Sequence, residues 1–132
     1  MKRILVLIIL ACTLCGCSTT KITTEEKTAL DFTVVEKSGI PQELLIIIDE
    51  KKTEEFTMSY TLDGYLYIAV GYGTKNTGGY SIQVEELYET KSNLGINTTL
   101  LGPKAGEAVN KMATYPYIVV KTEYIDKNIV FE

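Results

Sequence analysis

Acidic side chains are the first candidates for chemistry, because carboxylates serve as general acids, general bases and calcium ligands. They form three groups along the chain: Asp49 with Glu50, Glu54 with Glu55, and Glu85 and Glu86 with Glu89. No Asp-x-Asp-x-Asp-Gly calcium loop surrounds any group, and nothing in the spacing directs two carboxylates at one substrate. We interpret them as a solvated acidic surface and expect no metal site.

The composition excludes further kinds of active site and partner. The chain has 132 residues and no His, which excludes Ser-His-Asp triads, Cys-His pairs and His-ligated zinc. Its formal net charge of −4 argues against nucleic acid, which requires clustered Lys and Arg to neutralise phosphates. We expect a protein that is not an enzyme and that needs no cofactor.

The glycine-rich stretch at residues 71–79 (GYGTKNTGG) does not fit a phosphate-binding loop. The dinucleotide fingerprint requires a third Gly where this chain has Asn76, and it must open a helix. The triphosphate loop requires Gly-Lys-Ser/Thr, whereas here Lys75 follows Thr74. We interpret residues 71–79 as the wide loop of a β-hairpin, whose glycines relieve backbone strain.

Two separated motifs carry a family resemblance. Residues 73–82 (GTKNTGGYSI) fit the pattern G-x-K-x-T-G-G-Y-x-I, and residues 103–106 (PKAG) lead to residues 114–120 (TYPYIVV). Together they resemble the C-terminal domain of the PrcB family, accessory subunits of surface protease complexes, over roughly residues 65–121. The resemblance implies a non-enzymatic subunit that binds and stabilises an extracytoplasmic protease, with no catalytic residues.

The loop of the first motif is the candidate binding site. Its candidate residues are consecutive: Lys75, Asn76, Thr77, Gly78 and Gly79. We expect Lys75 and Asn76 to be exposed at the loop tip, and the two glycines to include at least one positive-φ position. Tyr80 alternates in phase with Ile82 and Val84 and is expected in the core.

The N-terminus has the pattern of a secretory signal. Basic residues at positions 2 and 3 precede the apolar run of residues 4–11, which is too short to span a membrane and typical of a signal-peptide core. The run leads to residues 14–17 (LCGC), which resemble the bacterial lipobox. The resemblance implies cleavage after residue 16 and attachment of a diacylglyceryl group to Cys17.

This interpretation divides the chain into three parts. Residues 1–16 are the lipoprotein signal peptide, residues 17–29 are the lipidated Cys and a polar tether, and residues 30–132 are a single globular domain. All three Cys lie at positions 12, 15 and 17, so the domain must be held by packing without disulfides. We expect a lipid-anchored, extracytoplasmic protein on the outer face of the cell membrane, or in the outer membrane of a two-membrane envelope.

A second hypothesis is an envelope lipoprotein that binds a glycan or a small solute. The nine Tyr and the absence of Trp favour a protein partner instead, because sugar-binding platforms more often use Trp. Exposed Tyr gives a protein interface a large contact area at a small cost in side-chain entropy.

Hydrophobic periodicity predicts the elements at the start of the domain. A short strand is expected over Asp31–Lys37. Apolar residues at i, i+3 and i+4 predict a helix over Pro41–Lys52 with Pro41 as its first residue, although the unbroken apolar run Leu44–Ile48 leaves a buried strand as the alternative.

Alternating patterns predict the later elements. They give a hairpin of strands 56–62 and 65–70 around Asp63-Gly64, a second hairpin across residues 71–79, a bulge at Glu85-Glu86, and strands over 96–101 and 115–124. Residues 103–114 are a long connection with one or two helical turns over 105–112, and residues 129–131 fold back on the preceding strand. The expected fold is mainly β, an antiparallel β-sandwich or roll with one amphipathic helix.

Overall fold

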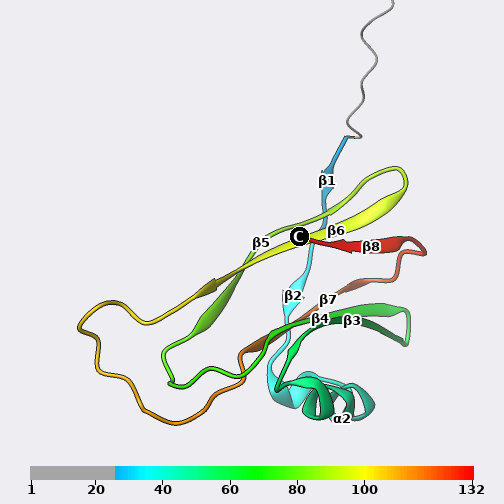
Figure 1. Cartoon of the computed structure of the whole chain (residues 1–132). Coiled ribbons are helices and arrows are strands. Elements are labelled where there is room, and N and C mark those ends of the chain that lie inside the picture. The colour runs from blue at the N-terminus through cyan, green and yellow to red at the C-terminus, as the bar shows by residue number, and fades with distance from the viewer. Residues whose placement is uncertain (1–25) are drawn as a thin grey trace, which may run out of the picture.

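Two four-stranded β-sheets stack face to face in the computed structural model, which describes residues 26–132 (Figure 1). The first sheet has the order β1-β5-β6-β8 and the second the order β2-β7-β4-β3. The strands are β1 (Thr28–Ala29), β2 (Thr33–Val34), β3 (Glu55–Leu62), β4 (Tyr65–Tyr72), β5 (Ser81–Glu89), β6 (Asn93–Leu101), β7 (Tyr117–Glu123) and β8 (Asn128–Phe131). The prediction of a mainly β sandwich with one α-helix is confirmed.

The space between the sheets is filled by one apolar cluster. Its buried members come from four strands, β4, β5, β6 and β7: Leu66, Ile68, Val70, Leu87, Leu94, Ile96, Ile118 and Val120. Along β4 the members recur at every second residue, as expected where one face of a strand meets a second sheet. Burial of these side chains supplies the main stabilisation of a domain that has no Cys to cross-link.

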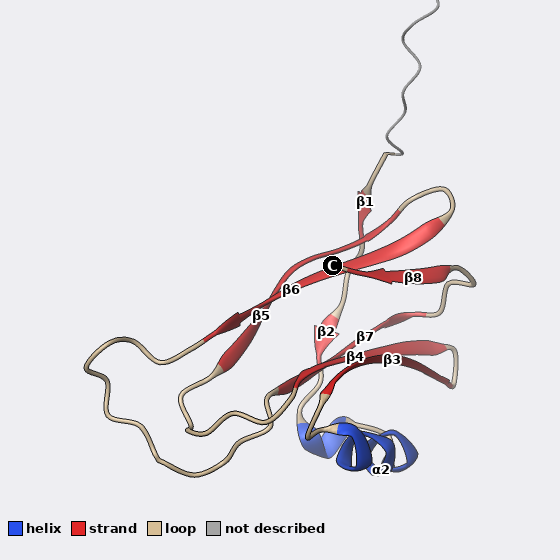
Figure 2. Ribbon diagram, in the orientation of Figure 1, coloured by secondary structure: helices blue, strands red, loops and turns tan. Residues whose placement is uncertain are grey.

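The helix α2 (Gln42–Lys51) covers the outer face of the second sheet (Figure 2). It is preceded by a single 3-10 turn, η2 (Lys37–Gly39). Leu44 and Ile48, one turn apart, are fully buried against Tyr67 and Val119 of the sheet. The helix prediction is confirmed over the buried-strand alternative, but Pro41 lies just before the first helical residue, with extended backbone angles.

The predicted hairpin at Asp63-Gly64 is also confirmed. Both turn residues have positive φ, 52° at Asp63 and 81° at Gly64, as a two-residue hairpin turn requires. The bulge in β5 lies where the pattern placed it, because the pairing with β6 shifts register between Val84 and Glu86.

The second predicted hairpin is wrong, because β4 and β5 lie in different sheets. β4 pairs with β3 on one side and with β7 on the other, so it has no free edge for β5. Residues 66–71 of β4 are buried without interruption, since one face meets the other sheet and the opposite face meets α2. A strand covered on both faces belongs at the centre of a sheet, and the segment after it must cross to the other layer.

Three smaller predictions are also corrected. The expected strand over Asp31–Lys37 is reduced to the two residues of β2, since the chain turns at once into η2. No helical turn forms within residues 105–112, because Gly106 has a φ of 83° and makes a tight turn after Pro103. Residues 129–131 do not fold back on β7; β8 pairs in parallel with β6 and contributes Ile129 and Phe131 to the inter-sheet core.

The predicted lipobox and Cys17 lie outside the described residues, as does most of the predicted tether. Within the described part, the chain is already paired at β1, where Thr28 and Ala29 oppose Glu89 and Tyr88 of β5. Among residues 26–132, no helix combines the length and apolarity that a membrane-spanning helix requires.

Candidate protein-binding site

The two sequence motifs meet in space as a pair of loops at one end of the sandwich. One loop, residues 73–80, connects β4 to β5, and the other, residues 102–116, connects β6 to β7. Both project away from the sheets on the same side and run next to each other (Figure 1). We call these two loops the paired-loop arm.

Backbone hydrogen bonds join the two loops. Lys75 and Thr114 form an isolated antiparallel bridge, with N–H to carbonyl distances of 2.8 and 2.9 Å. The Gly78 amide donates to the Asn110 carbonyl at 2.8 Å, and the Thr114 hydroxyl donates to the Thr77 carbonyl at 2.7 Å. Contacts of this kind give the arm a defined shape although it contains no regular secondary structure.

Gly79 is required where the loops come closest. Its φ of 89° confirms the predicted positive-φ position, and a Cβ at residue 79 would lie 3.1 Å from the side chains of both Pro103 and Val109. Gly78, by contrast, would place a Cβ at an ordinary 3.8 Å from Asn110. The second glycine of the pair therefore has a structural role in packing one loop on the other.

The base of the arm is fastened to the rest of the domain. The Thr74 amide and hydroxyl both donate to the Thr53 carbonyl, at 3.2 and 3.0 Å, just after α2. The Tyr72 amide donates to the Pro116 carbonyl at 3.0 Å. The arm thus begins and ends on the rigid helix-and-sheet layer, which is how a scaffold presents a binding loop.

The predicted site residues have different environments. Asn76 is exposed as expected, but Lys75 is partly buried, and its backbone is paired with Thr114. Thr77 and Gly78 face the second loop through their backbone groups. Sequence reasoning missed Val109 and Asn110, which form the other half of this contact, since neither belongs to a quoted motif.

The prediction for Tyr80 is only partly correct. Tyr80 is half-buried and belongs to neither core cluster, and its ring lies 3.2 Å from the position of a Cβ on Gly102. β5 begins at Ser81, after the backbone reversal at Gly79, so Tyr80 precedes the strand whose alternation it was assigned to. Its ring instead packs where the two loops leave the sheet.

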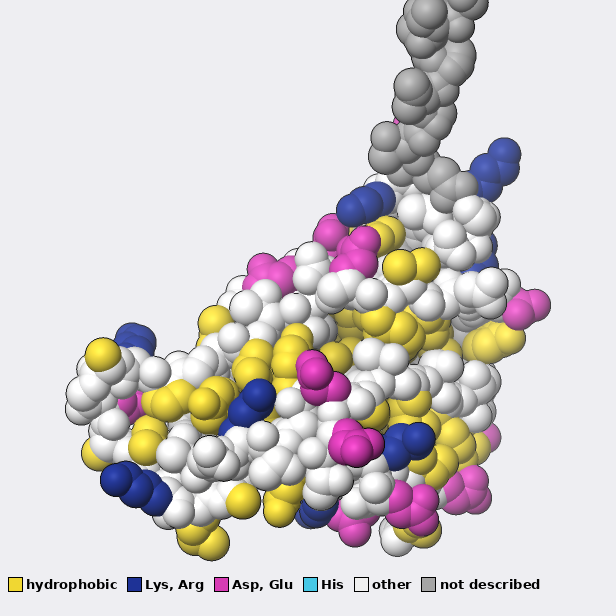
Figure 3. Space-filling view, in the orientation of Figure 1, with side chains coloured by type: hydrophobic (Ala, Val, Ile, Leu, Met, Phe, Trp, Pro, Cys, Tyr) yellow, Lys and Arg dark blue, Asp and Glu magenta, His cyan; other side chains and the backbone are white. Residues whose placement is uncertain are grey.

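The arm differs in charge from the rest of the described chain. It carries Lys75, Lys104 and Lys111 against a single acidic residue, Glu107. The remaining described residues hold seven Lys and fifteen acidic side chains. Met112 is 63% exposed at the arm, where Figure 3 shows Lys and hydrophobic side chains together at the left of the molecule. An exposed, unbranched apolar side chain among cations suits contact with an acidic protein surface.

Three acidic residues of the described chain form separate ion pairs. Asp49 pairs with Lys52 at 2.8 Å, and this hydrogen bond holds the pKa of Asp49 below its usual value. Glu86 lies 3.5 Å from Lys27, and no cluster of three metal-ligating side chains occurs within residues 26–132.

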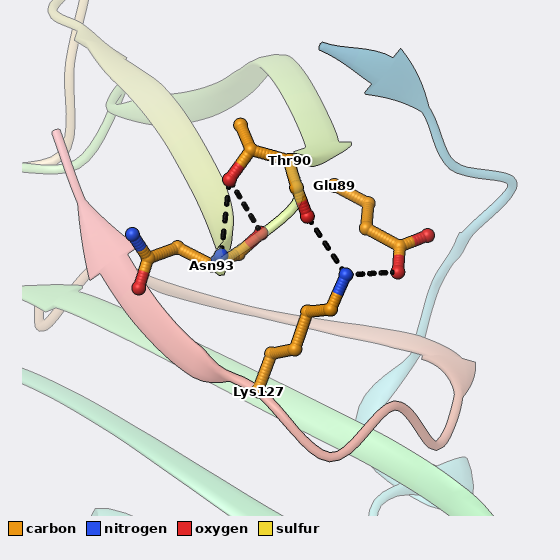
Figure 4. A network of polar contacts seen from close by, with 4 residues as sticks. All are labelled: Glu89, Thr90, Asn93 and Lys127. Atoms are coloured by element: carbon orange, nitrogen blue, oxygen red, sulfur yellow. Dashed lines mark hydrogen bonds and ion pairs between the residues drawn. The ribbon is translucent and has the colours of Figure 1, made fainter. Parts of the chain in front are cut away.

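One ion pair belongs to a structural network (Figure 4). Lys127 donates to the Glu89 carboxylate and to the Thr90 carbonyl, both at 2.7 Å. Thr90 and Asn93 are linked across the β5–β6 turn by hydrogen bonds of 3.0 and 3.2 Å. The network therefore joins the segment before β8 to the β5–β6 turn.

A comparison with models of protein families identifies the part of the chain that contains the paired-loop arm. Residues 66–123 match the family model described as PrcB C-terminal. The chain therefore carries a PrcB-like domain. The match runs from β4 to β7 and includes both loops of the arm. No curated protein and no solved structure matches the chain.

Proposed function

We propose that this protein is a lipid-anchored, non-enzymatic subunit that binds and stabilises an extracytoplasmic protease, and that the paired-loop arm contacts that partner. The observation that carries the proposal is the PrcB C-terminal match, which covers the whole arm. That family comprises accessory subunits of protease complexes, and this supplies the class of partner.

The form of the arm supports a binding role. Its two loops are fixed to each other and to the sheet, so little conformational entropy remains to be lost on binding. The exposed Met112 and the surplus of Lys offer an apolar contact surrounded by positive charge. An acidic patch with an apolar centre on the protease is the complementary surface.

The lipobox at residues 14–17 supports placement at a membrane surface. Two acyl chains give stable anchoring where a single chain gives only marginal binding. A tether of about a dozen residues then reaches on the order of 20 Å, enough to hold the domain near a membrane-associated partner. We therefore propose residues 17–27 as the tether, two residues shorter than predicted, because Thr28 and Ala29 already belong to β1 of the domain.

The test is capture of partners from whole cells by mild cross-linking and mass spectrometry. The native chain is expected to capture a protease, and a variant combining Lys75→Ala and Asn76→Ala to capture several-fold less at an unchanged melting temperature. A second variant combining Lys104→Glu and Lys111→Glu should lose capture more completely, because it reverses the charge of the second loop. Lys91→Glu, on the β5–β6 turn, is the matched control and should capture normally.

Two outcomes would count against the proposal. Full capture by both loop variants would exclude the arm as the contact surface. Recovery of glycan or small solute without any protease would instead support the second hypothesis, an envelope solute-binding lipoprotein.

A further inference from the structure

The sandwich is open along the edge formed by β3 and β8. Among the described strands β3 pairs only with β4, and its residues Thr57, Ser59 and Thr61 are exposed. Their cross-strand partners on β4 are Val70, Ile68 and Leu66, which all belong to the inter-sheet core. Cross-strand partners share a face, so these hydroxyl side chains lie on the inner face of the sandwich, beyond the cover of the opposite sheet.

A cavity of about 400 Å³ lies at this open edge, between the two layers. Its apolar lining comes from both sheets: Val70 of β4, Ile96 of β6 and Phe131 of β8. The hydroxyls of Tyr72 and Thr98, also in the lining, are hydrogen-bonded across the layers at 2.6 Å. Figure 3 shows hydrophobic side chains exposed between the two layers on this face.

The charge at the cavity has one sign. Glu55, on the same face of β3 as Thr57, lines it, and no Lys or Arg among the described residues does. Glu55 takes part in no ion pair with any residue of the described chain. A cation that enters the cavity would therefore meet an unpaired carboxylate at its rim.

Beside the same cavity, the outer edge of β6 beyond Ile96 pairs with no other strand of residues 26–132. β8 covers only Asn93–Ile96 of β6, and the Glu132 amide makes the last contact, with the Ile96 carbonyl at 2.9 Å. Residues 97–101 pair with β5 on one side, and on the other side no strand of the described chain reaches them. Free sheet edges of this kind accept an added strand, whose main-chain hydrogen bonds give affinity.

We propose that an extended segment of a protein partner adds to the free edge of β6 at residues 97–101 and places a Lys or Arg side chain in the cavity. In an added strand every second side chain points inward, over Ile96 and Thr98. The aliphatic stem of a long basic side chain matches the apolar lining, and its charged end reaches Glu55. The proposal requires a protein partner but not a protease, and it uses different residues from the arm.

The test is selection of peptide ligands on the full-length chain in detergent micelles, with a displayed library of random nonamers. The enriched peptides are expected to be rich in β-branched residues and to share one Lys or Arg position. The Glu55→Gln variant should bind a selected peptide about fivefold more weakly, the scale of one solvent-accessible ion pair. Glu54→Gln, the adjacent exposed carboxylate, is the matched control and should bind within twofold of the native chain.

Backbone methylation of the peptide tests strand addition directly. Methyl groups on alternate peptide nitrogens remove the N–H donors of one strand edge and leave those of the other edge intact. One of the two alternating patterns should abolish binding, and the other should leave it nearly unchanged. The proposal would be overturned if neither methylation pattern weakened binding, or if both patterns weakened it equally.

Three other results would also overturn it: no enrichment, enrichment of acidic peptides, or equal weakening by Glu55→Gln and Glu54→Gln. Self-association of the chain that a selected peptide competes away would assign the edge to a second copy of this protein instead. None of these results depends on which protein the arm captures, so failure here is distinguishable from failure of the proposed function.

Discussion

Residue 79 must be Gly for two reasons: its backbone is left-handed, and the two loops approach each other closely at this point. Side chains in the left-handed region cost about 1–2 kcal/mol, and here a Cβ would also press on Pro103 and Val109. We expect Gly79→Val to lower the free energy of unfolding by at least about 2 kcal/mol, measured by urea denaturation followed by circular dichroism. The destabilisation should appear whatever the protein binds.

Gly78→Ala is the control for this prediction, because its Cβ would have ordinary contacts and no left-handed backbone. We expect its unfolding free energy to remain within about 0.5 kcal/mol of the native value. Equal destabilisation by the two substitutions would show that the glycine pair matters for flexibility rather than for the packing of one loop on the other.

At the scale of elements, β8 depends on few contacts. It is four residues long, and its parallel pairing with β6 is reinforced by the Lys127 network just before it. The Lys127 and Glu89 side chains are 25% and 31% exposed, so solvent screening reduces their attraction. The contact with the Thr90 carbonyl adds a second charge-assisted hydrogen bond.

We expect Lys127→Met to lower the free energy of unfolding by about 1 kcal/mol while keeping most of the apolar stem. Amide hydrogen exchange in β8 should accelerate more than exchange in β4 or β7. Lys91→Met, an exposed Lys on the β5–β6 turn, should change neither quantity. Unaltered exchange in β8 would mean that its pairing is held by Ile129 and Phe131 alone.

At the scale of the whole molecule, we propose that a lipid anchor at Cys17 and the domain are independent parts. The lipobox resemblance predicts that the native chain partitions into the detergent phase and that Cys17→Ala does not, since it loses the site of lipid attachment. Cys15→Ala is the matched control, because a small residue remains at that position of the motif and partitioning should persist. Detergent-phase partitioning of Cys17→Ala equal to that of the native chain would contradict the anchor.

The pattern of residues alone determined the local elements and the family resemblance. Alternation and the Asp63-Gly64 pair were sufficient for the β3–β4 hairpin, whereas spacing at i, i+3 and i+4 favoured α2 without excluding a buried strand. Both signals are local, because period and turn conformation depend on residues close in sequence. The motifs around Gly78 and Thr114 likewise indicated a PrcB-like domain without any knowledge of the fold.

Only the tertiary structure decided which strands pair and how the motifs meet. Because β4 is buried on both faces, it has β3 and β7 as its neighbours, and β5 joins the other sheet. No feature of residues 71–79 distinguishes a hairpin loop from such a crossover. The tertiary structure alone also decided the parallel placement of β8, the close approach of Gly79 to Val109 and the open edge beside β6. Each depends on residues distant in sequence that compete for the same apolar surface, and that competition is resolved only when the whole core is packed.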